Sequence, residues 1–392
     1  MIDLLEIMAL ADEKGASDIH IAPLRRPSFR VHGEIVRLEE YEPITPEESE
    51  SILYSILRDD QRLEIDKNWE IDFSYEMRLA AHPIRFRVNM FRQNRGLAAV
   101  FRLIPYQILT PEQIGLETQI QELTKRPRGL VLVTGPTGSG KTTTLATMLD
   151  MINARDTSHI LTIEDPIEFV YQEKKCVISQ RELSAHTKSF ANALRSALRE
   201  DPDVILVGEM RDLETISLAL TAAETGHLVF ATLHTTDAPQ TVDRVIDVFP
   251  PQQQAMVRTQ LGGVLAAVVC QTLLPKIGGG RVAAREIMIT NPAIAHLIRD
   301  NQTHQLAGAI ATGIAKGMCP LELSLANKVI EGLVDVEAAM AAANRPHILE
   351  EYLKTKGGGI AAQSMSGAGS AGGGARSAEP KKTALVNPWG KK

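Results

Sequence analysis

An apolar segment that runs directly into a glycine-rich loop is the feature that most constrains this chain. Residues 130–142 read Leu-Val-Leu-Val-Thr-Gly-Pro-Thr-Gly-Ser-Gly-Lys-Thr. They fill every fixed position of the pattern G-x-x-x-x-G-K-[ST], with Gly135, Gly140, Lys141 and Thr142. In this pattern backbone N–H groups close around a polyphosphate, the lysine reaches the β- and γ-phosphates, and the threonine hydroxyl can bind Mg²⁺. The motif predicts a nucleoside triphosphate site at the start of a helix, formed by Gly135, Pro136, Thr137, Gly138, Ser139, Gly140, Lys141, Thr142 and Thr143.

The composition is that of a globular protein with no overall basic charge. A length of 392 residues suggests two domains and a tail. Hydrophobic residues make up 44% and charged residues 23%, and the net charge of −6 does not favour a nucleic-acid partner. The cysteines stand far apart, which argues against a zinc cluster or a disulfide framework and fits a reducing cytosol; they are Cys176, Cys270 and Cys319.

The sequence shows neither a signal-peptide pattern nor a membrane span. Several acidic residues interrupt Met1–Gly15. The longest weakly polar stretch, Leu261–Leu274, contains Gln271 and Thr272 and is too short to cross a bilayer. We therefore expect a cytoplasmic protein that acts at a membrane only through a partner.

Short alternating apolar runs dominate the first hundred residues and predict an antiparallel sheet. A helix is expected over residues 2–14 and another over Pro46–Leu57. The expected strands are Asp18–Ala22, Ser28–His32, Ile35–Leu38, Ile71–Tyr75, Ile84–Met90 and Leu97–Leu103. The prolines between Pro105 and Pro111 disfavour regular structure and predict a linker.

From about Glu117 expected strands alternate with helices, which is typical of a parallel sheet with crossover helices. The expected strands are Leu130–Thr134, His159–Glu164, Val204–Val207, Leu228–Leu233 and Arg281–Thr290, with short helices over Asn291–Leu353. The Gly/Ala/Ser-rich end cannot bury enough apolar surface to fold. The chain is thus predicted to be α/β, with parts at residues 1–105, 106–116 (linker), 117–355 and 356–392 (tail).

Acidic side chains follow two of the expected parallel strands. Glu164 begins an acidic segment that continues with Asp165 and Glu168. The segment holds the water shell of a magnesium ion, polarises an attacking water or forms a solvated turn. Glu209 follows the strand over Val204–Val207, where phosphate-loop proteins place the acid that holds the metal. Because glutamate reaches further than aspartate, we expect Glu209 to activate water or to bind Mg²⁺ together with Thr142.

Two histidines frame the expected strand Leu228–Leu233. His234 follows its carboxyl end and can donate a hydrogen bond to the γ-phosphate, and His227 precedes its amino end. An isolated histidine is more often structural. His234 is nevertheless a candidate catalytic residue on its position, and the resemblance described next adds His227.

These segments, taken together, resemble the secretion-superfamily ATPases, in which a Walker A loop, an Asp box, a Walker B segment and a His box follow one another. The matching runs are 135–142, 164–166, 208–212 and 225–235. Within that superfamily the chain is most similar to the pilus retraction, or twitching-motility, ATPases of type IV pili, on further matches at 16–20, 85–89 and 222–230. The resemblance extends over nearly the whole chain before the tail.

The resemblance implies a PAS-like N-terminal domain, a RecA-like ATPase domain with C-terminal helices, and a homo-hexamer that hydrolyses ATP with Mg²⁺. It implies work at the cytoplasmic face of the inner membrane, on an inner-membrane platform protein of the pilus. Arginines of the N-terminal domain reach the nucleotide in this family, and Arg87 and Arg102 occupy the matching positions. The linker over 107–115 is then the expected hinge. Other arginines that compete for the role are Arg195, Arg199 and Arg211.

The chain departs from the retraction members of the family near its C-terminal end. Where they carry Ala-Ile-Arg-Asn, a run tied to coupling hydrolysis to retraction, this chain has Ala293-Ile294-Ala295-His296. Cys319 also replaces a usual glutamine. Since the phosphate loop and the acidic segments keep the family pattern, these departures concern the mechanical output and leave the ATP site intact.

Three other functions are open. A related type II/IV secretion or pilus assembly ATPase is the nearest, although those proteins commonly carry a tetracysteine zinc insert and a longer N-terminal region that this sequence lacks. A RecA-like nucleic-acid motor is weaker, because the acidic balance and only two tryptophans argue against a DNA-binding strip. A nucleotide-gated adaptor with little turnover is least favoured, because Glu164 and Glu209 are both present.

Overall fold

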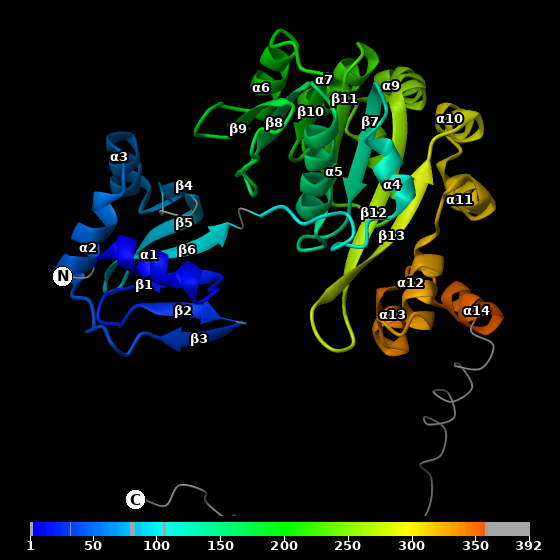
Figure 1. Cartoon of the computed structure of the whole chain (residues 1–392). Coiled ribbons are helices and arrows are strands. Elements are labelled where there is room, and N and C mark those ends of the chain that lie inside the picture. Colours follow the sequence, from blue (N-terminus) through cyan, green and yellow to red (C-terminus); the bar gives the residue numbers. More distant parts are fainter. Residues whose placement is uncertain (1–2, 32, 79–82, 105–106, 357–392) are drawn as a thin grey trace, which may run out of the picture.

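Two β-sheets, each with its own helices, organise the chain, and residues 107–117 connect them (Figure 1). The structure is a computed structural model that describes residues 3–356 except 32, 79–82 and 105–106. The expected tail beyond Lys356 and the start of the expected linker at Pro105 lie outside the described residues.

The first sheet is antiparallel, as predicted, and has the strand order β3-β2-β1-β6-β5-β4. Its elements are α1 (Leu4–Glu13), β1 (Asp18–Ile21), β2 (Ser28–Val31), β3 (Glu34–Arg37), α2 (Pro46–Ser55), α3 (Asp59–Asn68), β4 (Glu70–Arg78), β5 (Pro83–Gln93) and β6 (Gly96–Ile104). Helix α3 was not predicted, because its mostly charged sequence carries no apolar stripe. On the side of the helices, the buried rings of Phe86 and Phe101 meet edge to face at 6.2 Å.

The other face of this sheet carries a row of charged side chains. Direct cross-strand pairing puts Arg30, Asp18, Arg102, Arg87 and Ser74 side by side, in that order. Neighbouring like charges on a sheet are destabilising. Asp18 offsets this repulsion, because its Oδ1 accepts a hydrogen bond from Arg102 Nε at 3.0 Å.

The second sheet has the order β13-β12-β7-β11-β10-β8-β9, and every neighbouring pair is parallel except β12 and β13. Its elements are α4 (Thr118–Leu123), β7 (Gly129–Thr134), α5 (Lys141–Arg155), β8 (His159–Glu164), β9 (Val177–Glu182), α6 (Phe190–Ala197), β10 (Val204–Val207), α7 (Leu213–Glu224), β11 (Leu228–Leu233), α8 (Ala238–Asp247), α9 (Pro251–Val264), β12 (Leu265–Pro275) and β13 (Arg281–Ile289). The predicted strands over Leu130–Thr134, His159–Glu164, Val204–Val207 and Leu228–Leu233 are confirmed as parallel. The strand predicted over Arg281–Thr290 is present as β13, but it is antiparallel to β12. Strands β9 and β12 were not predicted, since β9 is mixed in polarity and β12 is buried on both faces and so lacks alternation.

Alternating side chains of β7 divide the core of this sheet into two layers. Leu130 and Leu132 pack in one layer with residues of α7, α8 and α9, and Val131 and Val133 pack in the other with residues of α4 and α5. Because β7, β8, β10 and β11 are parallel, their carboxyl ends meet at one edge. The loops that follow these four strands are therefore brought together, and they carry the predicted site.

The end of the described chain is helical, as predicted. It comprises α10 (Pro292–Arg299), η1 (Thr303–Gln305), α11 (Leu306–Thr312), η2 (Ile314–Lys316), α12 (Leu321–Ile330), α13 (Val336–Ala342) and α14 (Pro346–Lys356). Glu322 of α12 is fully buried and accepts from Arg345 Nη2 at 2.9 Å. The predicted α/β class with a helical C-terminal part is confirmed. Among the described residues, none of the helices combines the length and apolar character needed to cross a membrane.

The two sheets also touch through polar side chains. Glu182, buried at the end of β9, accepts from Ser74 Oγ on β4 at 2.8 Å and from Arg85 Nη2 on β5 at 2.6 Å. The same carboxylate accepts from the backbone N–H of Ile167 at 3.1 Å. The charged face of the first sheet is thus connected to the loop that follows β8.

Candidate functional site

The loop between β7 and α5 is held in a shape that only glycine permits. Gly135, Gly138 and Gly140 have φ angles of 138°, 80° and 85°, in the region that favours glycine. A Cβ atom on Gly135 would lie 2.2 Å from the backbone oxygen of Gln271, so β12 also leaves no room for a side chain there. The loop therefore packs directly against the sheet.

The cationic and hydroxyl donors of the loop suit a phosphate. Lys141 Nζ donates to the carbonyl oxygens of Gly135 and Pro136 at 2.8 and 3.1 Å. Burial lowers the pKa of Lys141, and the negative charges of Glu209 and Glu168 oppose this shift. Ser139 Oγ is buried and has no hydrogen-bond partner among the described residues. A bound anion would satisfy such groups, because each buried polar group without a partner costs free energy.

A cavity of about 180 Å³ lies beside this loop. Its walls come from the loop, from the segments after β8 and β10, and from the end of β11. Thr142 and Glu209 both line it, which puts together oxygen donors of the type that Mg²⁺ prefers. The residues around the cavity are Thr137, Gly138, Lys141, Thr142, Leu145, Glu164, Asp165, Pro166, Glu168, Tyr171, Phe190, Leu206, Gly208, Glu209, Thr232 and His234.

Glu164 is a buried carboxyl group at the end of β8. Burial raises its pKa to about 7, even though hydrogen bonds from Thr162 and Gln180 favour the charged form. Thr162 Oγ1 donates at 2.6 Å and Gln180 Nε2 at 3.2 Å, both to Glu164 Oε1. A carboxyl group whose pKa lies close to neutrality can take up and release a proton under ordinary conditions, as a general base requires.

Glu209 occupies a different electrostatic environment, two residues beyond β10. Its Oε1 atom lies 2.6 Å from Arg211 Nε and 2.9 Å from His234 Nε2. Burial raises the pKa of Glu209, but the hydrogen bond from Arg211 and the charges of His234 and Arg211 outweigh it and lower the pKa on balance. Glu209 is therefore a charged carboxylate, suited to orient water or hold a cation.

Gly208 brings the two glutamates close together. Its backbone N–H donates to the carbonyl oxygen of Ile163 at 2.7 Å. A Cβ atom at Gly208 would lie 3.0 Å from that oxygen and 3.2 Å from the Cα of Glu164. The absence of a side chain thus lets the end of β10 lie directly against the end of β8.

The structure does not bring every predicted residue to this cavity. His227 lies at the amino end of β11, where its Nδ1 is 2.9 Å from the carbonyl oxygen of Ala222, whereas His234 lies at the carboxyl end. Arg87 and Arg102 lie opposite each other on β5 and β6, and neither is among the described residues that line the cavity. Within one chain, the residues brought together are the loop, Glu164, Glu209 and His234.

Sequence reasoning missed several residues that complete the site. Thr162 and Gln180 bind Glu164, and Arg211 was considered only as a candidate arginine finger although it binds Glu209. Gln271 was noted only for interrupting an apolar stretch, yet its Nε2 donates to the loop carbonyl of Ser139 at 2.6 Å. Its position as a polar residue inside a long apolar run is the sequence signal that could have identified Gln271 as a residue of the site.

Comparison with known proteins identifies the family. The family model described as "Type II/IV secretion system protein" matches residues 2–362. A Pseudomonas aeruginosa protein named type IV pilus retractation ATPase PilT is 53% identical over 345 residues, which are 88% of this chain and 99% of the relative. A Neisseria gonorrhoeae twitching motility protein is 55% identical over 314 residues, covering 80% of this chain and 83% of the relative.

Solved structures agree with these relatives. A crystal structure of the pilus retraction motor PilT with bound ADP has 46% sequence identity and a TM-score of 0.84, covering 90% of this chain and 100% of that chain. The Legionella pneumophila ATPase DotB has 27% identity and a TM-score of 0.73, covering 87% and 95%. The structural similarity to the PilT crystal structure therefore extends over both β-sheets and the helices around them.

The contact between the loop and β12 makes Gly135→Ala a sharp test of this geometry. The added methyl group cannot fit beside Gln271, so the loop must move and its amides lose their alignment. We expect the affinity for ADP to fall about tenfold or more, which corresponds to about 1.4 kcal/mol. Binding of a fluorescent ADP derivative measures it.

Gly263→Ala is the matched control, because a Cβ atom there meets nothing within 4 Å. It should bind ADP as the wild type does. Unchanged ADP affinity in a folded Gly135→Ala protein would contradict the proposed shape of the loop.

Proposed function

This chain belongs to the type II/IV secretion system protein family, and on that premise we propose that it is an ATP-hydrolysing motor that drives retraction of a type IV pilus. One observation carries the proposal: residues of a complete phosphate-binding loop, Lys141 and Thr142 among them, line a single cavity together with two unlike glutamates. They do so in a chain that is 53% identical to a retraction ATPase over 99% of that relative.

The cavity residues support a division of labour in ATP hydrolysis. Lys141 and the loop amides bind the triphosphate, and Thr142 with Glu209 holds Mg²⁺, which neutralises phosphate charge when it is bound. Glu209 and Glu164 orient the attacking water, and the Glu164 carboxylate accepts its proton. His234 contacts the γ-phosphate, and its bond to Glu209 makes that contact sensitive to the state of the carboxylate.

Arg87 and Arg102 are proposed to act between subunits of a homo-hexamer. Their side chains are 46% and 68% exposed, and they lie on the face of the first sheet that is turned away from α1 and α2. In such a ring they would approach the nucleotide of a neighbouring subunit, where guanidinium groups offset the charge that spreads over the transferred phosphoryl group. The position of His227, at the amino end of β11 and beside the carbonyl oxygen of Ala222, does not support a catalytic role for it.

The proposal places the motor on the cytoplasmic face of the inner membrane, as a peripheral protein attached through a partner. That partner would be the inner-membrane platform protein of the pilus. No nucleic acid is expected to take part.

A second function is favoured by one observation. In α10, Ala295 is buried and His296 is exposed and lies 3.5 Å from Asp300, where the retraction proteins that the sequence resembles carry arginine and asparagine. This difference favours a motor of the same family that drives a different machine, such as a secretion system.

The roles of the cavity residues predict separate effects on binding and turnover. Glu209→Gln should lower the rate of ATP hydrolysis by about 10²–10⁴-fold while it leaves ADP affinity nearly unchanged, because the amide keeps the shape but loses the charge. Lys141→Ala should instead lose nucleotide binding. Steady-state hydrolysis and ADP titration measure both, and hydrolysis retained by Glu209→Gln would remove Glu209 from the catalytic role.

The raised pKa of Glu164 predicts the pH dependence of turnover. Below a pH of about 7 the carboxyl group is protonated and cannot accept a proton from water, so kcat should rise with pH through that value. Thr162→Val removes a hydrogen bond that favours the charged form, so it should move the inflection to higher pH. The measurement is kcat at saturating ATP across neutral pH in both proteins; an inflection that Thr162→Val does not move would belong to another group.

Retraction itself is tested in cells whose own retraction ATPase gene is deleted. Wild-type chain should restore pilus retraction, and Lys141→Ala should not. If pili assemble but do not retract with the wild-type chain, while the purified protein hydrolyses ATP, the motor drives another machine and Ala295 and His296 become the first positions to examine.

A further inference from the structure

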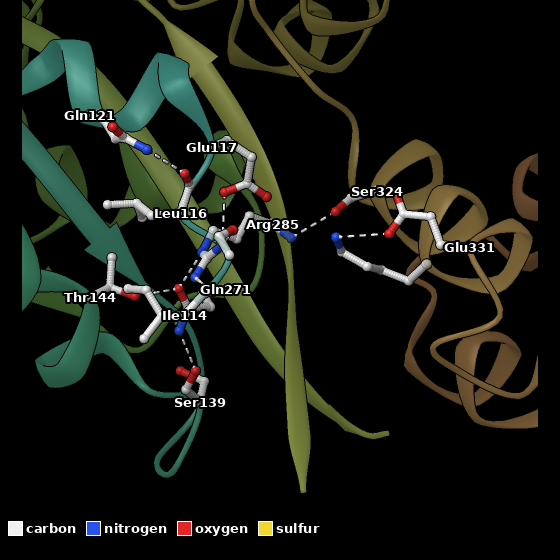
Figure 2. A network of polar contacts seen from close by, with 12 residues as sticks. Ile114, Leu116, Glu117, Gln121, Ser139, Thr144, Gln271, Arg285, Ser324 and Glu331 are labelled. Atoms are coloured by element: carbon white, nitrogen blue, oxygen red, sulfur yellow. Dashed lines mark hydrogen bonds and ion pairs between the residues drawn. The ribbon is translucent and has the colours of Figure 1, made fainter. Parts of the chain in front are cut away.

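A buried polar pair connects the phosphate-binding loop to the segment between the two sheets (Figure 2). Gln271 on β12 and Arg285 on β13 are direct cross-strand partners. Both side chains are buried, at 4% and 2% exposure, and Arg285 Nε donates to Gln271 Oε1 at 2.7 Å. A charged group this deeply buried is costly unless its partners compensate it, so the arrangement of those partners is informative.

The other side-chain hydrogen bonds of Gln271 are with the loop and with the first turn of α5. Its Nε2 donates to the carbonyl oxygen of Ser139 at 2.6 Å, and its Oε1 accepts from Thr144 Oγ1 at 2.8 Å. The orientation of the amide is unambiguous, because arginine can only donate and a carbonyl can only accept. Gln271 also lies against the glycines of the loop, since a Cβ atom on Gly140 would be 2.9 Å from its Nε2.

The guanidinium group of Arg285 points in the opposite direction, toward the linker. Nη1 donates to the carbonyl oxygen of Gly115 at 3.0 Å and to Glu117 Oε2 at 2.7 Å, and Nη2 donates to the carbonyl oxygen of Ile114 at 3.4 Å. Figure 2 shows this fork of contacts between Gln271 and the linker. The backbone N–H of Arg285 donates to Ser324 Oγ at 3.0 Å, which anchors β13 to α12.

A further hydrogen bond joins the linker to helix α5, which follows the phosphate-binding loop. Thr147 Oγ1, on α5, donates to the carbonyl oxygen of Leu109 at 2.8 Å. Ile108 and Ile114 pack against the core layer that contains α5. The expected hinge over 107–115 is therefore attached near both of its ends to the part of the chain that carries the phosphate-binding loop and α5.

We propose that Gln271 and Arg285 are positioning residues that transmit the nucleotide state of the phosphate-binding loop to residues 108–117. The proposal rests on the proposed function, because it requires that the loop binds nucleotide. Lys141 now donates to the carbonyl oxygens of Gly135 and Pro136, and a phosphate competes for the same ammonium group. A shift of the loop at Gly135 or Ser139 acts on Gln271, whose Oε1 is shared with Arg285.

The first test uses the wild-type protein and amide hydrogen exchange. We expect ADP to change the exchange rates of residues 108–117 as well as those of the loop. Exchange that changes in the loop but is the same in 108–117 with and without ADP would overturn the proposal.

The second test removes the side-chain contacts of Gln271 and Arg285, which together we call the relay. Arg285→Met and Gln271→Met keep an unbranched side chain of similar length and remove its polar contacts. Arg285→Lys keeps the positive charge but lacks the several N–H donors of the guanidinium group. We expect Arg285→Met to bind ADP within about threefold of the wild type. At saturating ADP both methionine variants should lose the response of 108–117, and kcat should fall by a larger factor than KM changes. Arg285→Lys should recover part of the response.

Gln121→Met is the matched control. Gln121 Nε2 donates to the carbonyl oxygen of Leu116 at 2.8 Å, so this variant also removes an amide contact to the linker but none to the loop. Its linker should respond to ADP as in the wild type. A wild-type response in Gln271→Met, or a lost response in Gln121→Met, would overturn the proposal.

The outcomes for the relay and for the proposed function are distinguishable. A wild-type linker that responds to ADP in a protein that retracts no pilus refutes only the proposed function. A protein that retracts pili while its linker ignores ADP refutes only the relay. Failure to bind nucleotide would refute both.

Discussion

The close contact between Gly135 and the backbone of β12 is the constraint on which the rest of the site depends. A Cβ atom on this glycine would lie only 2.2 Å from the Gln271 carbonyl oxygen, so only a residue without a side chain lets the phosphate-binding loop lie this close to β12. Because protein interiors are close-packed, a loop that touches the sheet this directly cannot shift without moving its neighbours. Two hydrogen bonds lie beside this contact: Lys141, the first residue of α5, donates to the carbonyl oxygen of Gly135, and the Gln271 amide donates to that of Ser139.

Two carboxyl groups in unlike surroundings line the cavity. Glu164 is buried and its hydrogen bonds only partly compensate for burial, so its pKa rises to about 7. Glu209 shares one oxygen between Arg211 and His234, so its pKa falls. Environments that push two pKa values apart are how enzymes separate acid–base from electrostatic roles with the same side chain.

Arg87 and Arg102 lie on the first sheet and are not among the described residues that line the cavity. The charged row on the first sheet holds Arg87 and Arg102 as direct neighbours, a costly pairing that Asp18 relieves at Arg102. Both side chains keep substantial exposed area while the opposite face of the same sheet is packed with apolar residues. In the homo-hexamer that we propose, this surface would approach the nucleotide of a neighbouring subunit.

The sequence by itself determined the phosphate-binding loop, the α/β class and three parallel strands to the residue, because these depend on local turn chemistry and on apolar runs. It also implied that Glu164, Glu209 and His234 lie together, since carboxyl ends of parallel strands meet at one edge. Only the tertiary structure decided that β12 lies beside β7, that Gln271 faces Arg285, and that His227 lies at the far end of β11. Strand order, register and burial are set by contacts between residues far apart in the chain, so no local pattern could reveal them.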